Sequence, residues 1–318
     1  MRIVFMGTRD IAEHVLGALL EAGRPDWQIV ASFTQPDRPL GRSATLQPPP
    51  VKLLAQRAGV LVYQPESLRS PEVVHDLQRL SPDVGLVASY AQLLPRRVLA
   101  IPPAGWLNVH PSLLPRHRGP SPVTSAILAG DIETGVTIIK LVKAMDAGPI
   151  VDQVRTTIGP NESAGALTER LGSLGAERTV AVLDDWVAGK LVAVLQDDSA
   201  ATYSTRLTRE DGRLDWSRPA EELVRRVRAF HPWPGTFTTW EGRRLVVLSA
   251  APIRQESGTA PGTVTGLFDS GSGPVILVAT GQGELAVSDL QIEGRRPLSA
   301  TEFVRGQPAL IGSVLGGN

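Results

Sequence analysis

The chain has 318 residues, of which 42% are hydrophobic and 20% charged, and its formal net charge is zero. These values are typical of a globular protein with one or two domains, and they argue against non-specific adhesion to nucleic acid or anionic lipid. The absence of cysteine excludes disulfides, thiolate nucleophiles and cysteine zinc sites. No apolar run approaches the roughly 18–20 residues that a membrane span needs, so we expect a cytoplasmic protein without membrane association.

The N-terminal part alternates strand and helix patterns, which predicts an α/β fold. Residues 2–6 form a strand pattern, and a glycine turn and a helix pattern follow it. The dinucleotide fingerprint G-x-G-x-x-G is absent because Thr8 and Arg9 follow Gly7, which argues against a nicotinamide cofactor. Helices are expected at 10–22, 51–58, 70–80, 123–129 and 163–187, and strands at 2–6, 29–33, 60–63, 84–88, 135–142 and 150–157.

Residues 34–50 lack apolar periodicity, and they are numerous for a loop in a compact domain. Loops of this length are often functional or disordered. Arg38 and Arg42 are the only cations in it. Two interpretations are open, namely a solvated surface loop or an arm that reaches for an anionic substrate.

The pattern changes near residue 203, after a polar stretch at 197–202 that we interpret as a linker. One helix pattern and a series of short strand patterns follow, separated by turns every ten residues or so, which suggests a small β-barrel or sandwich. The helix is expected at 220–230 and the strands at 236–241, 244–249, 262–265, 275–280 and 284–290. We therefore predict an α/β domain over residues 1–203 and a β-rich domain over residues 204–318.

Residues 106–115 have the features of a functional site. Asn108 and His110 lie two apart in a strand pattern, so their side chains project to the same face of the sheet. Pro111 keeps His110 in extended geometry. Another loop, at 90–95, also follows a strand. Because ligands of open α/β sheets bind at the carboxyl ends of strands, the two loops are candidates for two walls of one pocket.

Three polar side chains could carry the chemistry. The Asn108 amide can donate to a developing oxyanion, where one donor is typically worth on the order of 10²–10³ in rate. Asp146, in a turn closed by Gly148, could accept a proton or orient the imidazole of His110, which is worth about 10²–10⁴. The alternatives are a core histidine and a carboxylate that only forms a turn. Since no serine elbow or metal-ligand spacing is present, the set suits group transfer without a covalent enzyme intermediate.

The sequence resembles the methionyl-tRNA formyltransferases, within the folate-dependent formyltransferases, over nearly its whole length. The Asn108-x-His110-x-Ser112-Leu113-Leu114-Pro115 block is typical of the folate enzymes as a group. The segments that point to the tRNA enzyme are the loop Thr34–Arg42 and Phe230-x-Pro232-Trp233-Pro234. Further matching segments are Phe5–Thr8, Arg118-Gly119, Glu133–Thr137 and Asp146-x-Gly148.

The resemblance implies a Rossmann-like catalytic domain followed by an OB-like domain. It also implies transfer of the formyl group of 10-formyltetrahydrofolate to the α-amino group of methionine on initiator tRNA. Asn108 and His110 would stabilise the oxyanion, and Asp146 would handle the proton of the attacking amine. Tetrahydrofolate would be bound by Ser112, Leu113, Leu114, Pro115, Tyr90 and Leu93, and tRNA by Arg38, Arg42, Arg243 and Arg244. No metal is implied, and we expect a monomer.

The sequence departs from this family at two places. Pro111 stands where glycine is common, which should stiffen the site. Ser43, Ala44, Thr45 and Leu46 follow Arg42, where lysines are frequent. Together with zero net charge, this predicts a shallower salt dependence of tRNA binding than in a basic relative.

Two other functions remain open from the sequence. A folate formyltransferase acting on a small amine, such as a nucleotide or an amino sugar, would keep the catalytic block without needing the arginine loop. A non-catalytic RNA- or nucleotide-binding protein would tolerate loss of Asn108.

Overall fold

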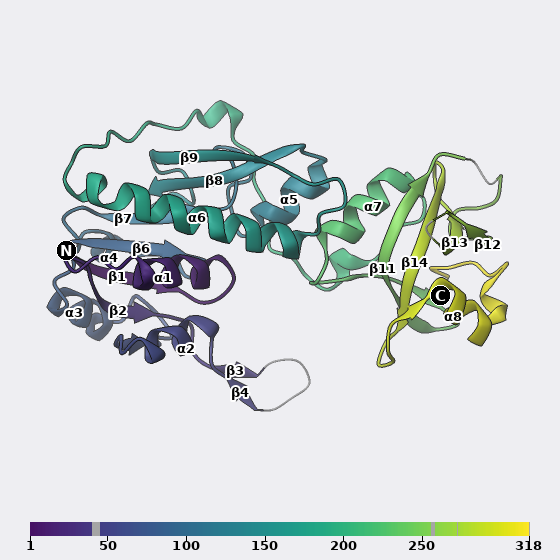
Figure 1. Cartoon of the computed structure of the whole chain (residues 1–318), viewed down its shortest axis with the longest axis horizontal. Helices are drawn as coiled ribbons and strands as arrows, with labels where there is room; N and C mark the ends of the chain where they lie inside the picture. Colours follow the sequence, from purple (N-terminus) through teal and green to yellow (C-terminus); the bar gives the residue numbers. More distant parts are fainter. Residues whose placement is uncertain (40–44, 256–257, 272, 318) are drawn as a thin grey trace. The chain divides into compact units, whose positions relative to one another are not determined.

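The computed structural model describes residues 1–39, 45–255, 258–271 and 273–317 (Figure 1). It divides into two compact units, which we describe separately. Unit 1 comprises Met1–Pro122, Ile132–Ile158 and Leu167–Thr205, and unit 2 comprises Val123–Asp131, Gly159–Ala166 and Arg206–Asn318. The domain boundary expected between residues 203 and 204 stays a prediction.

Unit 1 is built on a seven-stranded sheet with the order β5-β2-β1-β6-β7-β8-β9. The strands are β1 (Arg2–Gly7), β2 (Gln28–Phe33), β5 (Val62–Tyr63), β6 (Val84–Ala88), β7 (Trp106–His110), β8 (Glu133–Lys140) and β9 (Ile150–Thr157). The pairs from β5 to β7 are parallel, whereas β8 and β9 are antiparallel to their neighbours. The carboxyl ends of β1, β6 and β7 therefore meet at one edge of the sheet, as a Rossmann-like fold requires.

Helices cover both faces of this sheet. They are α1 (Ile11–Glu21), α2 (Pro50–Arg57), α3 (Pro71–Arg79), α4 (Arg96–Leu99) and α6 (Ala164–Val187). Leu77 of α3 and Val98 of α4 share a core with Trp106 of β7. On the opposite face of β7, α6 approaches so closely that a Cβ at Gly175 would lie 2.8 Å from Val109 Cγ1. Side chains alternate along β7, so Asn108 and His110 point to the same face as Trp106.

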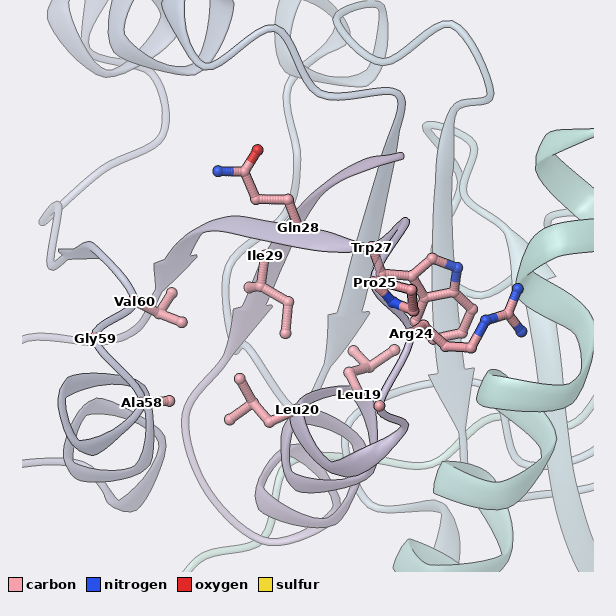
Figure 2. A pocket seen from close by; sticks show the side chains of 11 residues that line it. Leu19, Leu20, Arg24, Pro25, Trp27, Gln28, Ile29, Ala58, Gly59 and Val60 are labelled. Carbon is pink, nitrogen blue, oxygen red and sulfur yellow. The ribbon is translucent and has the colours of Figure 1, made fainter.

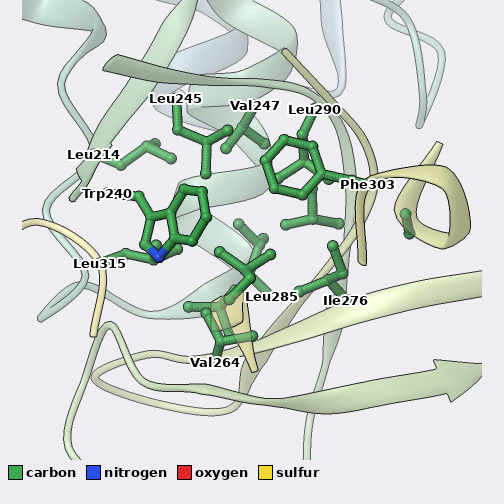
Figure 3. Packing of buried hydrophobic residues seen from close by; sticks show 14 of the residues in the cluster. Leu214, Trp240, Leu245, Val247, Val264, Ile276, Leu285, Leu290, Phe303 and Leu315 are labelled. Atoms are coloured by element: carbon green, nitrogen blue, oxygen red, sulfur yellow. The ribbon is translucent and has the colours of Figure 1, made fainter. Parts of the chain in front are cut away.

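Unit 2 contains an antiparallel sheet in which β10-β11-β14-β13-β12 are neighbours and β15 pairs with β14 (Figure 1). Its strands are β10 (Thr236–Trp240), β11 (Arg243–Ile253), β12 (Val264–Asp269), β13 (Pro274–Ala279), β14 (Glu284–Ile292) and β15 (Leu298–Ser299), and its helices include α5 (Pro122–Ala129), α7 (Ala220–Ala229) and α8 (Ala300–Gly306). Figure 3 shows Trp240 and Phe303 within the apolar core, where their rings meet edge to face at 6.0 Å. The predicted change from an α/β to a β-rich region is confirmed.

The structure corrects the expectation that residues 34–50 form a loop without regular structure. β3 (Arg38–Pro39) and β4 (Leu46–Gln47) pair in antiparallel fashion. At the root of this hairpin, the Asp37 carboxylate accepts hydrogen bonds from Lys52 Nζ at 2.7 Å and from Gln64 Nε2 at 2.7 Å. Strands of two residues are too short to produce a periodic pattern. Arg42 lies outside the described residues.

The stretch at 197–202, which we expected to be a linker, is also ordered. It contains the short helix η1 (Asp198–Ala200), and the Asp197 side chain accepts a hydrogen bond from the Ser199 backbone N–H. The whole stretch belongs to unit 1, whose last segment extends to Thr205.

Candidate active site

The structure brings Asn108, His110 and Asp146 together within unit 1. Asn108 lies in β7, which ends at His110, and Asp146 lies in the turn between β8 and β9. Asn108 Nδ2 donates to Asp146 Oδ1 at 3.4 Å, and Asp146 Oδ2 lies 3.7 Å from His110 Nδ1. Because β7 and β8 are adjacent strands, pairing of the sheet joins residues that are 38 positions apart in sequence.

His110 is buried, and its protonation state follows from its contacts. Its Nε2 lies 3.0 Å from the carbonyl oxygen of His117, which can only accept, so Nε2 carries the proton. Burial lowers the pKa of His110 below its ordinary value, although the negative charge of Asp146 opposes this effect. The ring is therefore neutral at neutral pH, and Nδ1 is a proton acceptor that faces the Asp146 carboxylate. His110 Nδ1 and Asp146 Oδ2 lie 3.7 Å apart and can each accept a proton, so a proton released by a substrate can pass between them.

Asp146 is held in a conformation that few non-glycine residues adopt, with φ at +49°. Its Oδ2 accepts a hydrogen bond from the Gly119 backbone N–H at 2.8 Å. The turn closes at Gly148, where an added Cβ would lie 1.8 Å from the Lys140 carbonyl oxygen, so no larger residue fits there. This backbone directs the carboxylate towards the end of β7.

The Asn108 side chain is half-buried, and its amide has hydrogen-bonding capacity left. Within the described part of the chain, its bond to Asp146 is the one side-chain hydrogen bond that this amide makes. A primary amide has two N–H donors. The second donor is thus available to an oxyanion that develops at the carboxyl end of β7.

The loop after His110 is anchored by Thr137 and Gln153, to which the sequence analysis assigned no role. Thr137 Oγ1 donates to the Ser112 carbonyl at 2.6 Å and accepts from the Leu114 N–H at 3.1 Å. Gln153 Nε2 donates to the Leu114 carbonyl at 2.9 Å. The Ser112 hydroxyl is engaged inside the loop because it donates to the Arg116 carbonyl at 2.7 Å. The loop therefore presents a fixed backbone beside His110.

The expected folate residues of this loop and of the loop after β6 differ in exposure. Leu114 is buried, whereas Leu113 and Pro115 are half-buried and Leu93 is 68% exposed. The Tyr90 side chain is buried in the core, and burial raises its pKa. Its hydroxyl has no partner among the described residues.

The four arginines predicted to contact tRNA are distributed over both units. Arg38 is exposed, and its Nη2 lies 3.8 Å from Glu66 Oε2. Arg42 is outside the described residues. In unit 2, Arg243 pairs with Glu241 at 2.9 Å, and Arg244 places its guanidinium carbon 3.4 Å from the Phe237 ring centroid. Arg244 has no carboxylate partner among the described residues, so its charge is available to an external anion.

Unit 1 also contains a hollow at a distance from the candidate active site. A hollow of about 390 Å³ is lined by Leu19, Trp27 and Ile29 among others, near the start of β2 (Figure 2). It lies at the amino edge of the parallel strands, away from Asn108.

Among the described residues, no three His, Asp or Glu side chains are grouped as a metal ion would require. None of the helices in the described segments has the length and apolar character needed to cross a membrane.

Comparisons with known proteins agree with this architecture. Residues 1–183 match the formyl transferase family, and residues 206–308 match the formyl transferase C-terminal domain. The methionyl-tRNA formyltransferase of Chloroflexus aggregans is 47% identical over 306 residues, which cover 96% of this chain and 97% of that protein. The corresponding protein of Roseiflexus castenholzii is 46% identical over 319 residues, or 100% of this chain and 99% of its own length.

Among solved structures, HypX from Aquifex aeolicus, crystallised with tetrahydrofolic acid, superposes with a TM-score of 0.61 at 18% identity. The match covers 96% of this chain and 47% of HypX, so the chain spans about half the length of that protein. This likeness concerns the fold. The sequence matches extend through both units, and on their strength the chain belongs to the formyl transferase family, among the methionyl-tRNA formyltransferases.

Proposed function

We propose that the enzyme transfers the formyl group of 10-formyltetrahydrofolate to the α-amino group of methionine on initiator tRNA, in the cytoplasm. The observation that carries this proposal is the convergence of Asn108, His110 and Asp146 at the carboxyl end of β7. These three groups supply an amide donor, a neutral imidazole and a carboxylate, which are the groups that acyl transfer to an amine needs. The near full-length similarity to methionyl-tRNA formyltransferases supports the choice of acceptor.

In the proposed reaction, the lone pair of the amine attacks the formyl carbon, and a carbon–nitrogen bond forms as the carbonyl oxygen becomes an oxyanion. Asn108 Nδ2 donates to this oxygen. The carboxylate of Asp146 takes up the proton that the amine loses and passes it to Nδ1 of His110, which then becomes an N–H donor that also stabilises the oxyanion. Collapse of the intermediate breaks the bond to N10 of the folate, and the proton passes to N10. Atoms and charge therefore balance without a covalent enzyme intermediate.

Binding roles complete the proposal. Tetrahydrofolate would lie against the backbone of the loop formed by Ser112, Leu113, Leu114 and Pro115, with Tyr90 and Leu93 on the facing loop. The tRNA would be contacted by Arg38, Arg42, Arg243 and Arg244. Residues 1–203 would form the catalytic domain and residues 204–318 an OB-like tRNA-binding domain, in a monomeric enzyme.

The test is an acceptor comparison with purified enzyme and 10-formyltetrahydrofolate. Methionyl initiator tRNA, the same tRNA uncharged, free methionine and a nucleotide-linked amino sugar are offered separately, and formylated product is quantified. We expect product with the charged tRNA alone. Formylation of the amino sugar at a comparable rate would refute the proposed acceptor, and no product with any acceptor would refute the reaction.

A further inference from the structure

The backbone of the Asp146 turn is held by Gln196, which lies 50 residues further along the chain. Gln196 Nε2 donates to the Asp146 carbonyl at 2.8 Å and to the Gly148 carbonyl at 2.7 Å. Asp146 occupies the left-handed region, with φ at +49°, and such a conformation persists only where its surroundings enforce it. The two bonds therefore stabilise the backbone that carries the candidate catalytic carboxylate.

Arg118 fixes the orientation of the Gln196 amide. Gln196 Oε1 accepts from Arg118 Nε at 3.0 Å and from Nη2 at 2.7 Å. A guanidinium can only donate, so Oε1 must face Arg118 and the NH₂ group must face the turn. With two bonds donated and two accepted, the amide is fully satisfied. The Arg118 side chain is 3% exposed, which keeps this pairing away from competing water.

The residue after Arg118 contacts the carboxylate itself. The Gly119 N–H donates to Asp146 Oδ2, while the Arg118 N–H donates to the Thr202 carbonyl at 2.9 Å and the Arg118 carbonyl accepts from the Ser204 N–H at 2.7 Å. The Arg118–Gly119 segment thus restrains Asp146 twice. One restraint acts directly on the carboxylate, and the other acts through Gln196 on the backbone.

We propose that Gln196, oriented by Arg118, is a positioning residue that aims the Asp146 carboxylate at the attacking amine. The inference rests on the proposed function, because it assigns Gln196 an effect on the rate only through Asp146. Gln196 is not assigned a contact with substrate, since its amide is already saturated by Arg118 and the turn. A misplacement of about 1 Å at a reacting group can cost on the order of 10²-fold in rate.

The first test compares Gln196→Met and Gln196→Glu with wild type. Methionine removes all four bonds at similar size, and glutamate keeps the Arg118 pairing but turns a carboxylate oxygen towards two carbonyl oxygens. We expect kcat to fall by about 10²-fold, with the KM values for both substrates largely unchanged. Asp198→Asn is the matched control, because Asp198 Oδ1 also accepts from Arg118 Nη2 but Asp198 is 82% exposed and does not contact the turn. Unchanged kcat in folded Gln196→Met would overturn the inference.

A double-mutant cycle separates positioning from general stability. In an Asp146→Asn background, Gln196→Met should produce almost no further loss of kcat, since the group that it positions is gone. Equal losses in both backgrounds would show that Gln196 acts independently of Asp146 and would refute the proposal. Should Gln196→Met fail to fold, Gln196→Asn, which keeps the amide but shortens its reach, is put through the same cycle with the same criteria. An inactive wild type would instead refute the proposed function.

Discussion

The ionisable groups of the candidate active site in unit 1 are buried, whereas Arg213 and Arg296 of unit 2 are exposed. His110 is 4% exposed and the Asp146 side chain 14%, and both make several defined polar contacts. Arg213 and Arg296 are 54% and 72% exposed, and each pairs with a nearby glutamate. The candidate active site therefore holds a few polar groups in fixed positions inside the protein, whereas these arginines of unit 2 lie in contact with solvent.

This difference predicts different sensitivities to substitution. In a buried network the effective dielectric is low, so removal of one partner leaves another polar group uncompensated. Exposed ion pairs contribute about 0–1 kcal/mol each and are screened by salt. Substitutions near Asp146 should therefore change rates by orders of magnitude, whereas single arginine substitutions in unit 2 should change affinity by small factors.

The largest effect is expected for Asp146→Asn. The substitution keeps the size of the side chain but removes the group that accepts the amine proton, so kcat should fall by about 10²–10⁴-fold. Steady-state formyl transfer measures this, with Asp152→Asn as the matched control, because Asp152 pairs with Arg178 away from the site. A rate for Asp146→Asn within a few-fold of wild type would remove the carboxylate from the mechanism.

An intermediate effect is expected from pH. Burial depresses the pKa of His110, so the neutral ring persists as the pH falls from 8 to about 6.5, the ordinary histidine value, and is protonated only below it. The α-amino group of the substrate also takes up a proton in this range, because its ordinary pKa is about 7.7–8.0, so kcat/KM must be corrected for protonation of the amine. The corrected profile should be flat across that interval and decline at lower pH. The free energy of unfolding should also decrease as the pH falls below that interval. As the pH falls below about 6.5, the unfolded chain takes up the proton first, and the free energy of unfolding decreases until the folded-state pKa is passed.

Two measurements check this prediction. The pH–rate profile is recorded for wild type, and denaturant unfolding is recorded for wild type and His110→Gln across the same range. A decline that begins above pH 7 in the kcat/KM profile corrected for protonation of the amine, or identical pH dependence of unfolding in both proteins, would contradict a depressed His110 pKa.

The smallest effect is expected in unit 2. Arg244 has no carboxylate partner in the described chain, whereas Arg243 is already paired with Glu241. Arg244→Ala should weaken tRNA binding by a few-fold and lower the slope of log affinity against log salt by about one, and Arg243→Ala should change both less. Filter binding over a salt series tests this. Equal effects of the two substitutions would show that pairing with Glu241 does not limit the phosphate contact.

Much of the fold follows from local sequence patterns. Buried strands such as β6 and amphipathic helices such as α3 can be recognised from their own sequences. The predicted limits of β6 are the observed ones, and those of α3 differ by one residue at each end. The helix α8 was missed although Ser299 and Glu302 form a capping box, which is a pattern that the sequence displays. The hairpin of β3 and β4 was missed because two-residue strands show no period.

The candidate site was predictable in part for a similar reason. Asn108 and His110 share one strand end, and the Gly148 turn marks Asp146 as unusual. Arg118 and Gln196 belong to the same network, but their side-chain hydrogen bonds span 48 to 85 residues and depend on tertiary packing. No local spacing relates Gln196 to Asp146, so only the folded chain identifies that contact.

The most direct test of the central claim is single-turnover formyl transfer to methionyl initiator tRNA by wild type and Asn108→Ala. Asn161→Ala, at an exposed asparagine in unit 2, is the matched control. If the Asn108 amide stabilises the oxyanion, the rate of the chemical step should fall by about 10²–10³-fold while tetrahydrofolate binding is retained. An unchanged rate in Asn108→Ala would contradict the assignment of this cluster as the active site.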